Sequence, residues 1–512
     1  MPQEDPRPPQ EEMDDGSSRL AESINAGGDV VGGDKIVAGG DVVQGDKITQ
    51  VTVNRGAIQI GTFSIPTLPV VLGALVVTAG LIFVGLSVRE TPGPARMPGG
   101  FNVAVAQFGQ EDANGKVQSS EEGQRLSRTV FEVLRQQTSE FSDIELRSLV
   151  QIWHDSLPTS EMGTDIGLIA DEQAAAELAE RIGADMVIYG NIDPQNNFIP
   201  QFYVSTEAKG EIDSHVTGHH TLGSKPIRVD RQTQLATGTD LATRARALFY
   251  LTIGLTYDVI GRLQDALNVY REAETELQSW DELGEGKEVL HFFLGQAALY
   301  LSQQPEGLAL APQLRQEAQQ AFENSINSNP DYARPHVGLG SVYYLQALDT
   351  QPLSALLHSS DALRTAFDEY NRALALAKQS ADRQAETLAT YSLGTAFYLQ
   401  AGAYRSDGQI DAADEAFRQA IDTFDAVIAS LRATNQQRLL GQAYQAQGTA
   451  YKESAKMWAE QGDQSRAATL VALARQSLDQ CIALGDDSQD EVLLELIIRD
   501  LCVPQLRALE NP

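Results

Sequence analysis

The sequence is poor in the residues that build metal sites and disulfide scaffolds. Its 512 residues include two cysteines, Cys481 and Cys502, both near the C-terminal end, and seven widely spaced histidines. Two cysteines exclude a disulfide-rich scaffold, and no CxxC or Cys/His spacing indicates a zinc site. Cys481 falls in an apolar helical pattern and is expected to be a small core residue. Two thiols do not reveal the redox compartment of the protein.

Basic residues and catalytic motifs are also scarce. The 38 lysines and arginines face 70 acidic residues, which gives a formal net charge of −32. Such a charge repels phosphate backbones, so nucleic acid is not an expected partner, and we interpret the excess of acid as a solubility feature. The sequence contains no P-loop, dinucleotide fingerprint, GxSxG or HExxH motif. It therefore predicts a protein that is not an enzyme and holds no cofactor.

One histidine cluster is a candidate metal site. His215, His219 and His220 occur in the stretch DSHVTGHH, which contains glycine and threonine. The stretch lacks the helical spacing that places two ligands on one face, so a solvated loop is the favoured interpretation. Metal ligation by these three histidines, with the metal-dependent enzyme that it implies, is the alternative.

A long uncharged run lies between Arg55 and Arg89. Its second half is almost continuously apolar, and as a helix it reaches about 30 Å, the thickness of a bilayer's hydrocarbon core. We expect a single-pass transmembrane helix over residues 66–88; a buried helix or a cleaved signal peptide are weaker alternatives. The residues assigned to the span are the first and last of its apolar run and the glycines at which a second helix can pack: Leu68, Gly73, Gly80, Gly85 and Val88.

Two different segments precede this run. Residues 1–24 are acidic and rich in proline, which predicts a disordered tail. Residues 25–62 form a Gly/Asp-rich segment in which GGDVVGGDKIVA is followed directly by GGDVVQGDKITQ. Gly-Asp turns between β-branched pairs predict short strands, which cannot bury a face alone. Self-assembly through residues 27–50 and an inert stalk are the main interpretations, and calcium binding by the Gly-Asp turns is a weaker third one, because Lys35 and Lys47 would repel a cation. The motif resembles GGDVVGGDK-type stretches of bacterial signalling and defence proteins.

A Pro/Gly linker is expected over residues 89–100, and an α/β domain over residues 101–232. FNVAVAQF alternates like a strand, and SSEEGQRLSRTVFEVLRQQ is an amphipathic helix with Ser119 and Glu122 at capping-box spacing. IELRSLV (residues 144–150) is interpreted as a strand, DEQAAAELAERIG as a helix that begins at Asp171, and DMVIYGNID as a third strand. This alternation predicts a layered domain with a partly parallel sheet.

The same domain resembles the N-terminal domain of the TolB translocation protein. The resemblance lies in the first strand, VAVAQF, in the helix GQRLSRTVFEVL, and in AAELAERIGADMVIYGNID. It implies a bacterial, non-catalytic interaction module placed between a membrane anchor and helical repeats. It also implies a cytoplasmic N-terminus, with the C-terminal bulk of the chain outside the cytoplasm.

From residue 241 to residue 512 the chain shows a recurrent helical pattern. Its first copy places Gly254 between Tyr250 and Tyr257 on one helix, and an Ala–Tyr–Ala ladder centred on Tyr270 on the next. Looser copies have crossing glycines at Gly295, Gly340, Gly394 and Gly448, with ladders centred on Phe322, Tyr370, Phe417 and Leu478. The pattern resembles tetratricopeptide repeats, and the wide spacing of the glycines predicts longer helices. A capping helix is expected in DEVLLELIIRDLCVPQLRAL.

Such repeats bind protein segments along the groove that is built by the first helix of each pair. The positions that follow each crossing glycine are the candidate groove residues: Leu255, Asp258, Gln296, Leu299, Ser341, Tyr344, Tyr391, Thr395, Tyr398, Thr449 and Lys452. The expected fold is thus multidomain, with a β-repeat segment, a transmembrane helix, an α/β domain and an all-α solenoid. The expected function is a membrane-anchored scaffold for protein or peptide partners. A transmembrane sensor that binds a ligand in the α/β domain is the main alternative.

Overall fold

The computed structural model describes residues 95–510 with short gaps. The gaps are residues 159–163, 207–213, 224, 230–233, 278–285, 359–360, 433, 435, 487 and 489, and only the backbone is described for residues 234–240 and 510. The expected tail (1–24) and β-repeat segment (25–62) lie outside the described residues. Self-assembly through residues 27–50 therefore stays a prediction.

The prediction of a membrane-spanning fold has to be corrected. In the part of the chain that the structure describes, no helix is both long enough and apolar enough to cross a bilayer. Even the long helix α13 (Ile410–Leu431) buries Phe417 and Phe424 on one side and exposes Asp411 and Glu415 on the other. The segment 66–88 itself lies outside the described residues. The structure therefore gives no support for a single-pass location, for an orientation in a membrane or for the membrane as a partner.

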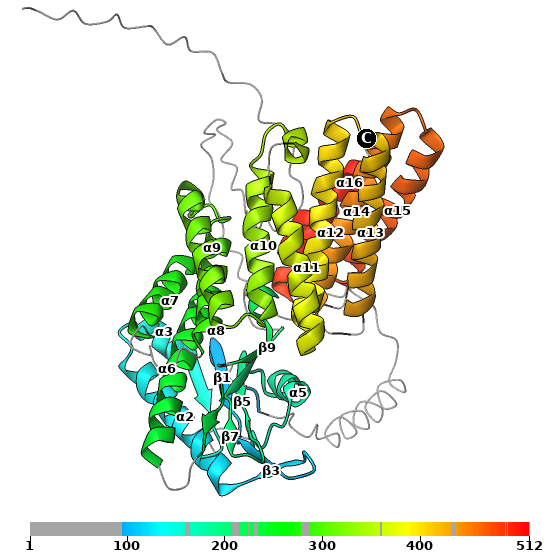
Figure 1. Cartoon of the computed structure of the whole chain (residues 1–512). Helices are drawn as coiled ribbons and strands as arrows, with labels where there is room; N and C mark the ends of the chain where they lie inside the picture. The colour runs from blue at the N-terminus through cyan, green and yellow to red at the C-terminus, as the bar shows by residue number, and fades with distance from the viewer. Residues whose placement is uncertain are drawn as a thin grey trace, which may run out of the picture.

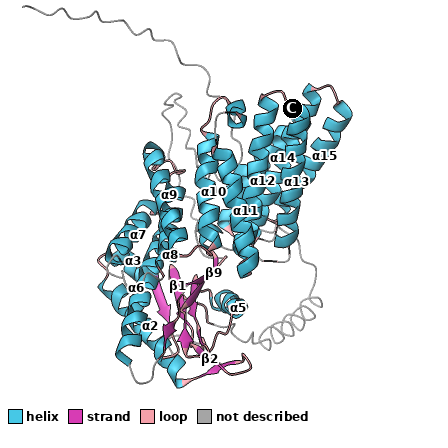
Figure 2. Ribbon diagram, viewed as in Figure 1, coloured by secondary structure: helices cyan, strands magenta, loops and turns pink. Residues whose placement is uncertain are grey.

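Residues 95–228 form a small α/β unit around a mixed sheet (Figures 1 and 2). Its strands are β4 (Val150–Trp153), β1 (Phe101–Val105), β5 (Met186–Tyr189), β8 (Gln201–Val204) and β9 (Gly218–Thr221), in that order. The first three are parallel, and β8 and β9 are antiparallel to their neighbours. The expected partly parallel sheet is confirmed.

A second, smaller sheet continues from the first at the lower end of Figure 1. Its order is β10 (Ile227–Arg228), β7 (Asn197–Phe198), β6 (Asn191–Ile192), β2 (Gly109–Glu111) and β3 (Val117–Ser119). β2 and β6 form a parallel pair, and each follows closely in sequence after a parallel strand of the main sheet. Two neighbouring strands therefore leave the main sheet together and start the second one.

Side-chain caps set the starts of the helices in this unit. Its helices are α2 (Glu121–Glu140), α3 (Ile144–Leu149), α5 (Glu172–Ile182) and the short 3₁₀ helix η1 (Ser214–Val216). Asp171 caps α5 as expected, and the cap of α2 is Ser120 rather than the expected Ser119. The strand expected over residues 144–150 is wrong. Asp143 accepts a hydrogen bond from the N–H of Leu146 and starts α3 there, so the strand begins only at Val150.

Helices cover both faces of the main sheet. Alternate residues of β1 point to opposite sides, so that Ala104 meets α5 while Val103 and Val105 belong to the core that α2 shares with later helices. Those later helices are α6 (Gln234–Val259) and α8 (Lys287–Leu301) of the helical region. The end of the expected linker also packs, because Met97 is buried and its N–H bonds to Ile182.

The rest of the chain is a stack of antiparallel helix pairs. After α6 and α8, the elements are α7 (Leu263–Leu277), α9 (Ala311–Ser328), α10 (Ala333–Leu348), α11 (Ala362–Ser380), α12 (Arg383–Ser406), α13, α14 (Gln437–Glu460) and α15 (Gln464–Ala483). The pairs are α6–α7, α8–α9, α10–α11, α12–α13 and α14–α15, and each pair packs on the next. This arrangement is compatible with a helical-repeat solenoid.

Crossing glycines let the two helices of a pair approach closely. A Cβ atom on Gly254 would lie 2.2 Å from a ring carbon of Tyr270, and similar contacts join Gly295 to Phe322 and Gly340 to Tyr370. Gly448 meets Leu478 in the same way. These four crossings are confirmed. In the fourth pair, Gly394 meets Phe424 rather than the expected Phe417, because the two longer helices cross two turns further along α13.

The prediction of longer helices is confirmed only for the last two pairs. There α12 and α14 have 24 residues each. In the second and third pairs the additional residues lie in the connections, which contain the 3₁₀ helices η3 (Leu308–Leu310) and η4 (Leu353–Leu357).

The stack ends in a cap made by the π-helix η5 (Leu493–Cys502) and helix α16 (Val503–Glu510). Both pack against α15, and η5 also packs against α14. A disulfide joins Cys481 of α15 to Cys502 of η5. The expected capping element is thus confirmed, but the sequence did not reveal that its two cysteines pair.

Candidate functional site

The expected groove residues lie on the first helices of the five pairs, and most of them are buried. Buried are Leu255, Gln296, Leu299, Tyr344, Thr395 and Thr449; half-buried are Asp258, Ser341, Tyr391, Tyr398 and Lys452. The first helices of successive pairs pack directly on one another, and α6 and α8 also pack against the sheet. The inner positions are therefore filled by neighbouring elements over much of the stack.

The half-buried aromatic positions take part in packing within the stack. The ring of Tyr391 lies 5.7 Å from that of Phe424, and the ring of Tyr398 lies 6.0 Å from that of Phe417. At the other end, the Lys452 ammonium donates a hydrogen bond to Gln505 of the cap. These contacts explain the side chains without a ligand, and their role in binding remains a prediction.

A buried arginine joins the helical region to the edge of the sheet. Arg334, at the start of α10, has a side chain that is 2% exposed and pairs with Asp382 at 3.0 Å. Its guanidinium also donates to the carbonyls of Thr217, at 2.7 Å, and His219, at 3.0 Å, both near or on strand β9. Burial opposes ionisation of Asp382, but the charge and hydrogen bonds of Arg334 outweigh it and lower the pKa of this carboxyl. The junction is therefore an ionised pair inside the molecule.

The junction extends to the next two helices of the inner layer. Gln384, at the start of α12, donates to the carbonyl of Ser214 at 3.0 Å and accepts from Gln436 of the α14 start at 2.8 Å. A cavity of about 30 Å³ lies beside it, between these helix starts and the end of β8. This volume holds about one water molecule, so the junction is not a ligand pocket.

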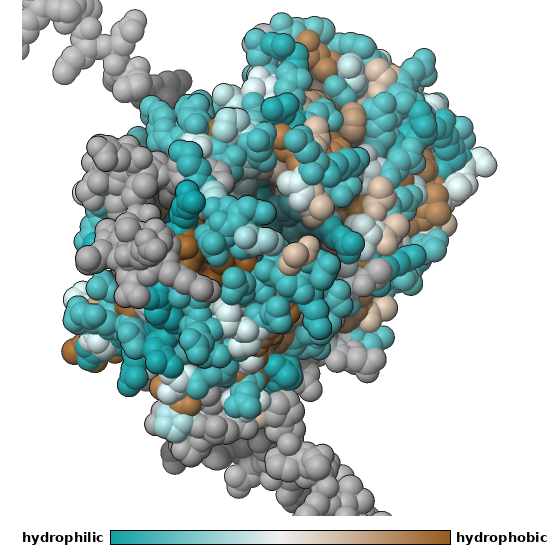
Figure 3. Space-filling view, turned by 60° about the horizontal axis from the view of Figure 1, so that its bottom comes forward, coloured by the Kyte–Doolittle hydropathy of each residue, from teal (hydrophilic) through white to brown (hydrophobic). Residues whose placement is uncertain are grey.

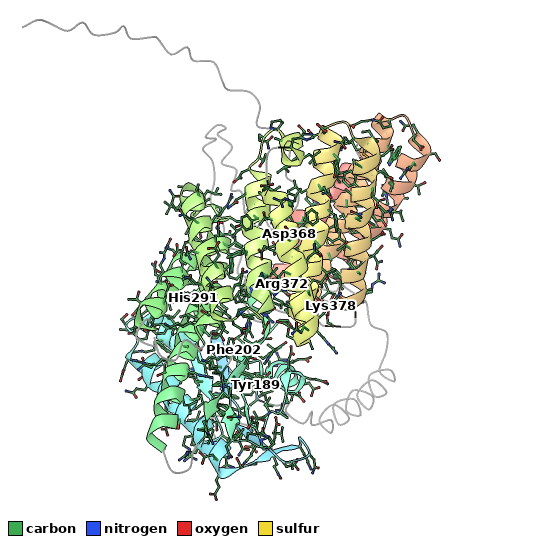
Figure 4. The ribbon with its side chains drawn as sticks, in the orientation of Figure 1. Tyr189, Phe202, His291, Asp368, Arg372 and Lys378 are labelled. Carbon is green, nitrogen blue, oxygen red and sulfur yellow. A yellow bond between two sulfur atoms is a disulfide. The ribbon has the colours of Figure 1, made fainter. Side chains whose placement is uncertain are left out.

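The histidines of the expected metal cluster are separated by the strand that carries them. His219 and His220 are consecutive in β9, so their side chains point to opposite faces of the sheet. His219 contacts the Tyr189 hydroxyl at 2.7 Å, whereas His220 stacks on Phe202 at 4.8 Å between ring centroids. Tyr189 and Phe202 belong to the neighbouring strands β5 and β8 (Figure 4). His215 lies in η1. Among the described residues, no group of three or more His, Cys, Asp or Glu side chains is placed to hold a metal ion.

Burial keeps these two rings neutral. It lowers the pKa of His219 to about 4 and that of His220 well below its usual value, with the positive charge of Arg334 acting in the same direction. Nε2 of His220 donates to the carbonyl of Val216 at 2.8 Å. Packing and hydrogen bonding within the junction account for both side chains.

Another histidine, His154, lies beside a serine as in a catalytic pair, but its ring is in the wrong tautomer to accept a proton from that serine. Nε2 of His154 lies 3.2 Å from the Ser127 hydroxyl. Nδ1 of the same ring accepts the backbone N–H of Ser156 at 3.0 Å, so the proton of the neutral ring is on Nε2. That nitrogen donates to Ser127 and cannot take its proton. Both side chains are buried, and burial lowers the pKa of His154.

An open cleft of about 420 Å³ lies where the α/β unit meets the first helix pair. One wall is the end of α2 with the turn that follows it, and the opposite walls are α6 and α7. Its lining residues are Gln137, Glu140, Phe141, Ser142, Phe249, Tyr250, Tyr257, Asp265, Asn268, Val269, Glu272 and Glu276. The cleft therefore combines parts of the chain that are more than a hundred residues apart.

The cleft has an aromatic floor and an acidic rim. The rings of Phe141 and Phe249 meet edge to face at 5.8 Å, and Tyr250 lies against Phe249 at 5.3 Å. Glu272 and Glu276 are exposed one turn apart on α7. Burial raises the pKa of Tyr250, and its hydrogen bond to Glu276 acts in the same direction. None of the described residues that line the cleft is basic.

At one end of the cleft, an arginine of the chain itself forms ion pairs with two carboxylates. Arg262 pairs with Asp143 at 2.9 Å and with Asp265 at 2.7 Å, and its guanidinium lies 4.8 Å from the ring centre of Tyr257. The Tyr257 hydroxyl donates to Asp143 at 3.0 Å. Burial and this hydrogen bond raise the pKa of Tyr257 to about 12.

Elsewhere the described surface offers few large apolar groups. The exposed ones are Ile144, Ile260, Leu308, Leu310 and Leu473, and they do not form one broad patch. The face seen in Figure 3 is largely hydrophilic, with apolar residues in narrow strips. Sequence reasoning did not find the cleft, since its walls are adjacent only after α2 has packed on α6.

Fold and surface together define a class: a small mixed α/β unit whose core continues into a stack of helix pairs, with a polar junction and a large cleft between the two parts. No protein-family model matches the chain, and no curated protein sequence matches it.

Proposed function

We propose that this protein is a non-catalytic interaction protein that binds a segment of a partner protein in the cleft between α2, α6 and α7. The single observation that carries the proposal is the cleft of about 420 Å³ with Phe141, Phe249 and Tyr250 on its floor. Aromatic side chains in a concave surface supply a large contact area at low entropic cost, and such residues often dominate binding energies between proteins.

We also infer that the helix pairs are repeats of the tetratricopeptide type and that the α/β unit is of the TolB N-terminal type. The first inference is supported by glycines packed against aromatic rings at four crossings, such as Gly254 on Tyr270. The second is supported by the parallel strands β1 and β5 and by Gly183, which ends α5 in the left-handed conformation before β5. In both families the expected role is protein binding, which agrees with the proposal.

The experiment blocks the cleft without removing any buried side chain. Peptides are selected from a random library on the full chain, and their affinities are measured by fluorescence anisotropy. Asn268, which is exposed on the rim, is changed to Cys and labelled with a bulky maleimide; Gln476, which is exposed on α15, is treated in the same way as the control. The native cysteines are paired in the disulfide, so labelling is selective.

We expect the label at position 268 to weaken peptide binding about tenfold or more and the label at position 476 to leave it unchanged. Peptides that bind equally well to both labelled chains would place the binding surface elsewhere and overturn the proposal. Failure to select any binding peptide would do the same.

A further inference from the structure

We propose that the cleft recognises a positively charged side chain, an arginine or lysine of the bound segment, rather than a purely apolar anchor. The inference rests on the proposed function and names the chemistry of the partner. The aliphatic stem of the side chain lies on Phe141 and Tyr250, and its cationic end lies at the rim formed by Glu272 and Glu276.

The cleft presents negative charge to a ligand. Glu140, Asp265, Glu272 and Glu276 all line it, and none of its described lining residues is basic. Glu272 and Glu276 lie four residues apart on α7, a spacing at which like charges repel and weaken a helix. A cation between them removes this repulsion.

At the neighbouring tyrosine, Tyr257, the chain itself binds a cation with an aromatic ring and carboxylates. The Arg262 guanidinium lies over the face of Tyr257, 4.8 Å from its centre, and between the carboxylates of Asp143 and Asp265. A cation above an aromatic ring is attracted by the electrons of that ring, and flanking carboxylates strengthen the attraction. Tyr250 lies two turns earlier on α6, and its hydroxyl is bonded to Glu276. The pair of Tyr257 and Asp143 therefore has a counterpart in Tyr250 and Glu276, which line the open volume of the cleft.

Two basic residues near the cleft have to be considered as competitors. Arg246 lies one turn before Tyr250 on α6, is exposed, and interacts with its hydroxyl electrostatically. Arg271 pairs with Glu317 at 2.6 Å and donates a hydrogen bond to the cleft residue Asn268 at 3.1 Å, so its charge is already neutralised by Glu317. One exposed arginine therefore offsets part of the acidic rim. The net charge of −32 for the whole chain favours the approach of a cationic segment.

The test compares a charged probe with a neutral probe of the same shape. The probes are a short fluorescein-labelled peptide of alternating arginine and leucine residues and its counterpart with citrulline in place of each arginine. Their affinities are measured on the full chain, on the variant Glu272→Gln/Glu276→Gln and on a control variant, Asp411→Asn/Glu415→Gln. The control removes two exposed acids at the same spacing on α13, far along the chain from the cleft.

We expect the arginine peptide to bind the unmodified chain about tenfold more tightly than the citrulline peptide. The preference should be lost in the Glu272→Gln/Glu276→Gln variant and kept in the control variant, because both variants change the net charge equally. Since all four carboxylates are exposed, circular dichroism should show the same helix content in the three proteins.

Equal binding of the arginine and citrulline peptides, or a preference that persists without Glu272 and Glu276, would overturn the inference. If both peptides bind equally and the label at position 268 still displaces them, the charge specificity is wrong while the proposed cleft stands. If neither peptide binds and the library also gives no binder, both proposals are wrong.

Discussion

The α/β unit covers the first end of the stack of helix pairs and reaches along it to the starts of α10 and α12, whereas the short segment that follows α15 covers the last end. The first cover shares a continuous apolar core with α6 and α8 and is fastened by the buried pair of Arg334 and Asp382. The last cover packs a few apolar residues on α14 and α15 and is tied to α15 by a disulfide.

The two covers are fastened differently because they differ in sequence distance from the helices that they contact. Strand β9 and Arg334 are more than a hundred residues apart, so the orientation of the sheet must be specified by contacts with defined geometry. The cap is connected to α15 by a short loop, and a single covalent bond between residues 21 positions apart is enough.

Removing the buried arginine should weaken the first end most. Arg334→Ala leaves the half-buried Asp382 without its partner and frees the carbonyls of Thr217 and His219, so we expect a loss of about 3 kcal/mol or more in unfolding free energy. The measurement is urea unfolding followed by circular dichroism. Arg364→Ala, which removes an exposed ion pair on α11, serves as the control and should cost less than about 1 kcal/mol. Equal losses in the two variants would show that the junction does not fasten the sheet.

Removing the disulfide should weaken the last end and leave the first unchanged. Cys481→Ala with Cys502→Ala should cost about 3 kcal/mol, since the bond closes a loop of moderate length. Hydrogen exchange should become faster in η5 and α16 while strands β1 and β5 keep their protection. Dithiothreitol should have the same effect on the native chain and none on the variant. Faster exchange throughout the sheet would contradict the separation of the two ends.

Filling a helix crossing in the first pair should have an intermediate effect. Gly254→Ala places a methyl group against the buried ring of Tyr270 and should cost about 1–3 kcal/mol in thermal or urea unfolding. Gly402→Ala is the matched control, because its methyl group meets only the end of the Leu353 side chain at 3.1 Å. That variant should be neutral or stabilised by up to about 1 kcal/mol through higher helix propensity. A tolerated Gly254→Ala would mean that the crossing is loosely packed.

Lowering the pH from 6.5 towards 4 should destabilise the α/β unit by less than the substitutions above and should leave the cap unaffected. Burial lowers the pKa of His219 to about 4, so the unfolded chain binds a proton there more readily than the folded chain. Its contribution to stability is present above pH 6.5 and is lost as the pH falls from 6.5 towards 4, with about 1 kcal/mol lost by pH 6. His219→Gln should have a shallower dependence of unfolding free energy on pH. The chain has no histidine after His358, so protection of the cap should not change over this range.

The parts of the fold that sequence predicted are those set by local pattern. Small residues opposite aromatic ones identified the crossings at Gly254 and Tyr270, because the two helices of a pair are neighbours in sequence. Asp171 was recognised as a helix cap for the same reason. The crossing partner of Gly394 was predicted two helical turns too early, at Phe417 instead of Phe424, since the actual lengths of α12 and α13 decide where they cross.

Features that depend on distant contacts were missed. The interpretation of residues 144–150 as a strand followed their apolar content and overlooked Asp143, whose side chain starts α3. The cleft requires α2 to pack on α6, and no pattern within either segment reports that contact. The buried positions of Leu255 and Leu299 likewise follow from the sheet and neighbouring helices that cover them, which the repeat pattern alone does not describe.

The polar junction limits how this architecture can change in evolution. Proteins built from stacked helix pairs commonly gain or lose a pair by duplication or deletion, because each pair contacts only its neighbours. Here Arg334 of α10 and Gln384 of α12 both bond to the same short stretch of the α/β unit, and Gln436 of α14 bonds to Gln384. Inserting or removing a pair between α8 and α14 would carry these side chains away from their partners. The number of repeats in this part of the molecule is therefore fixed by the sheet.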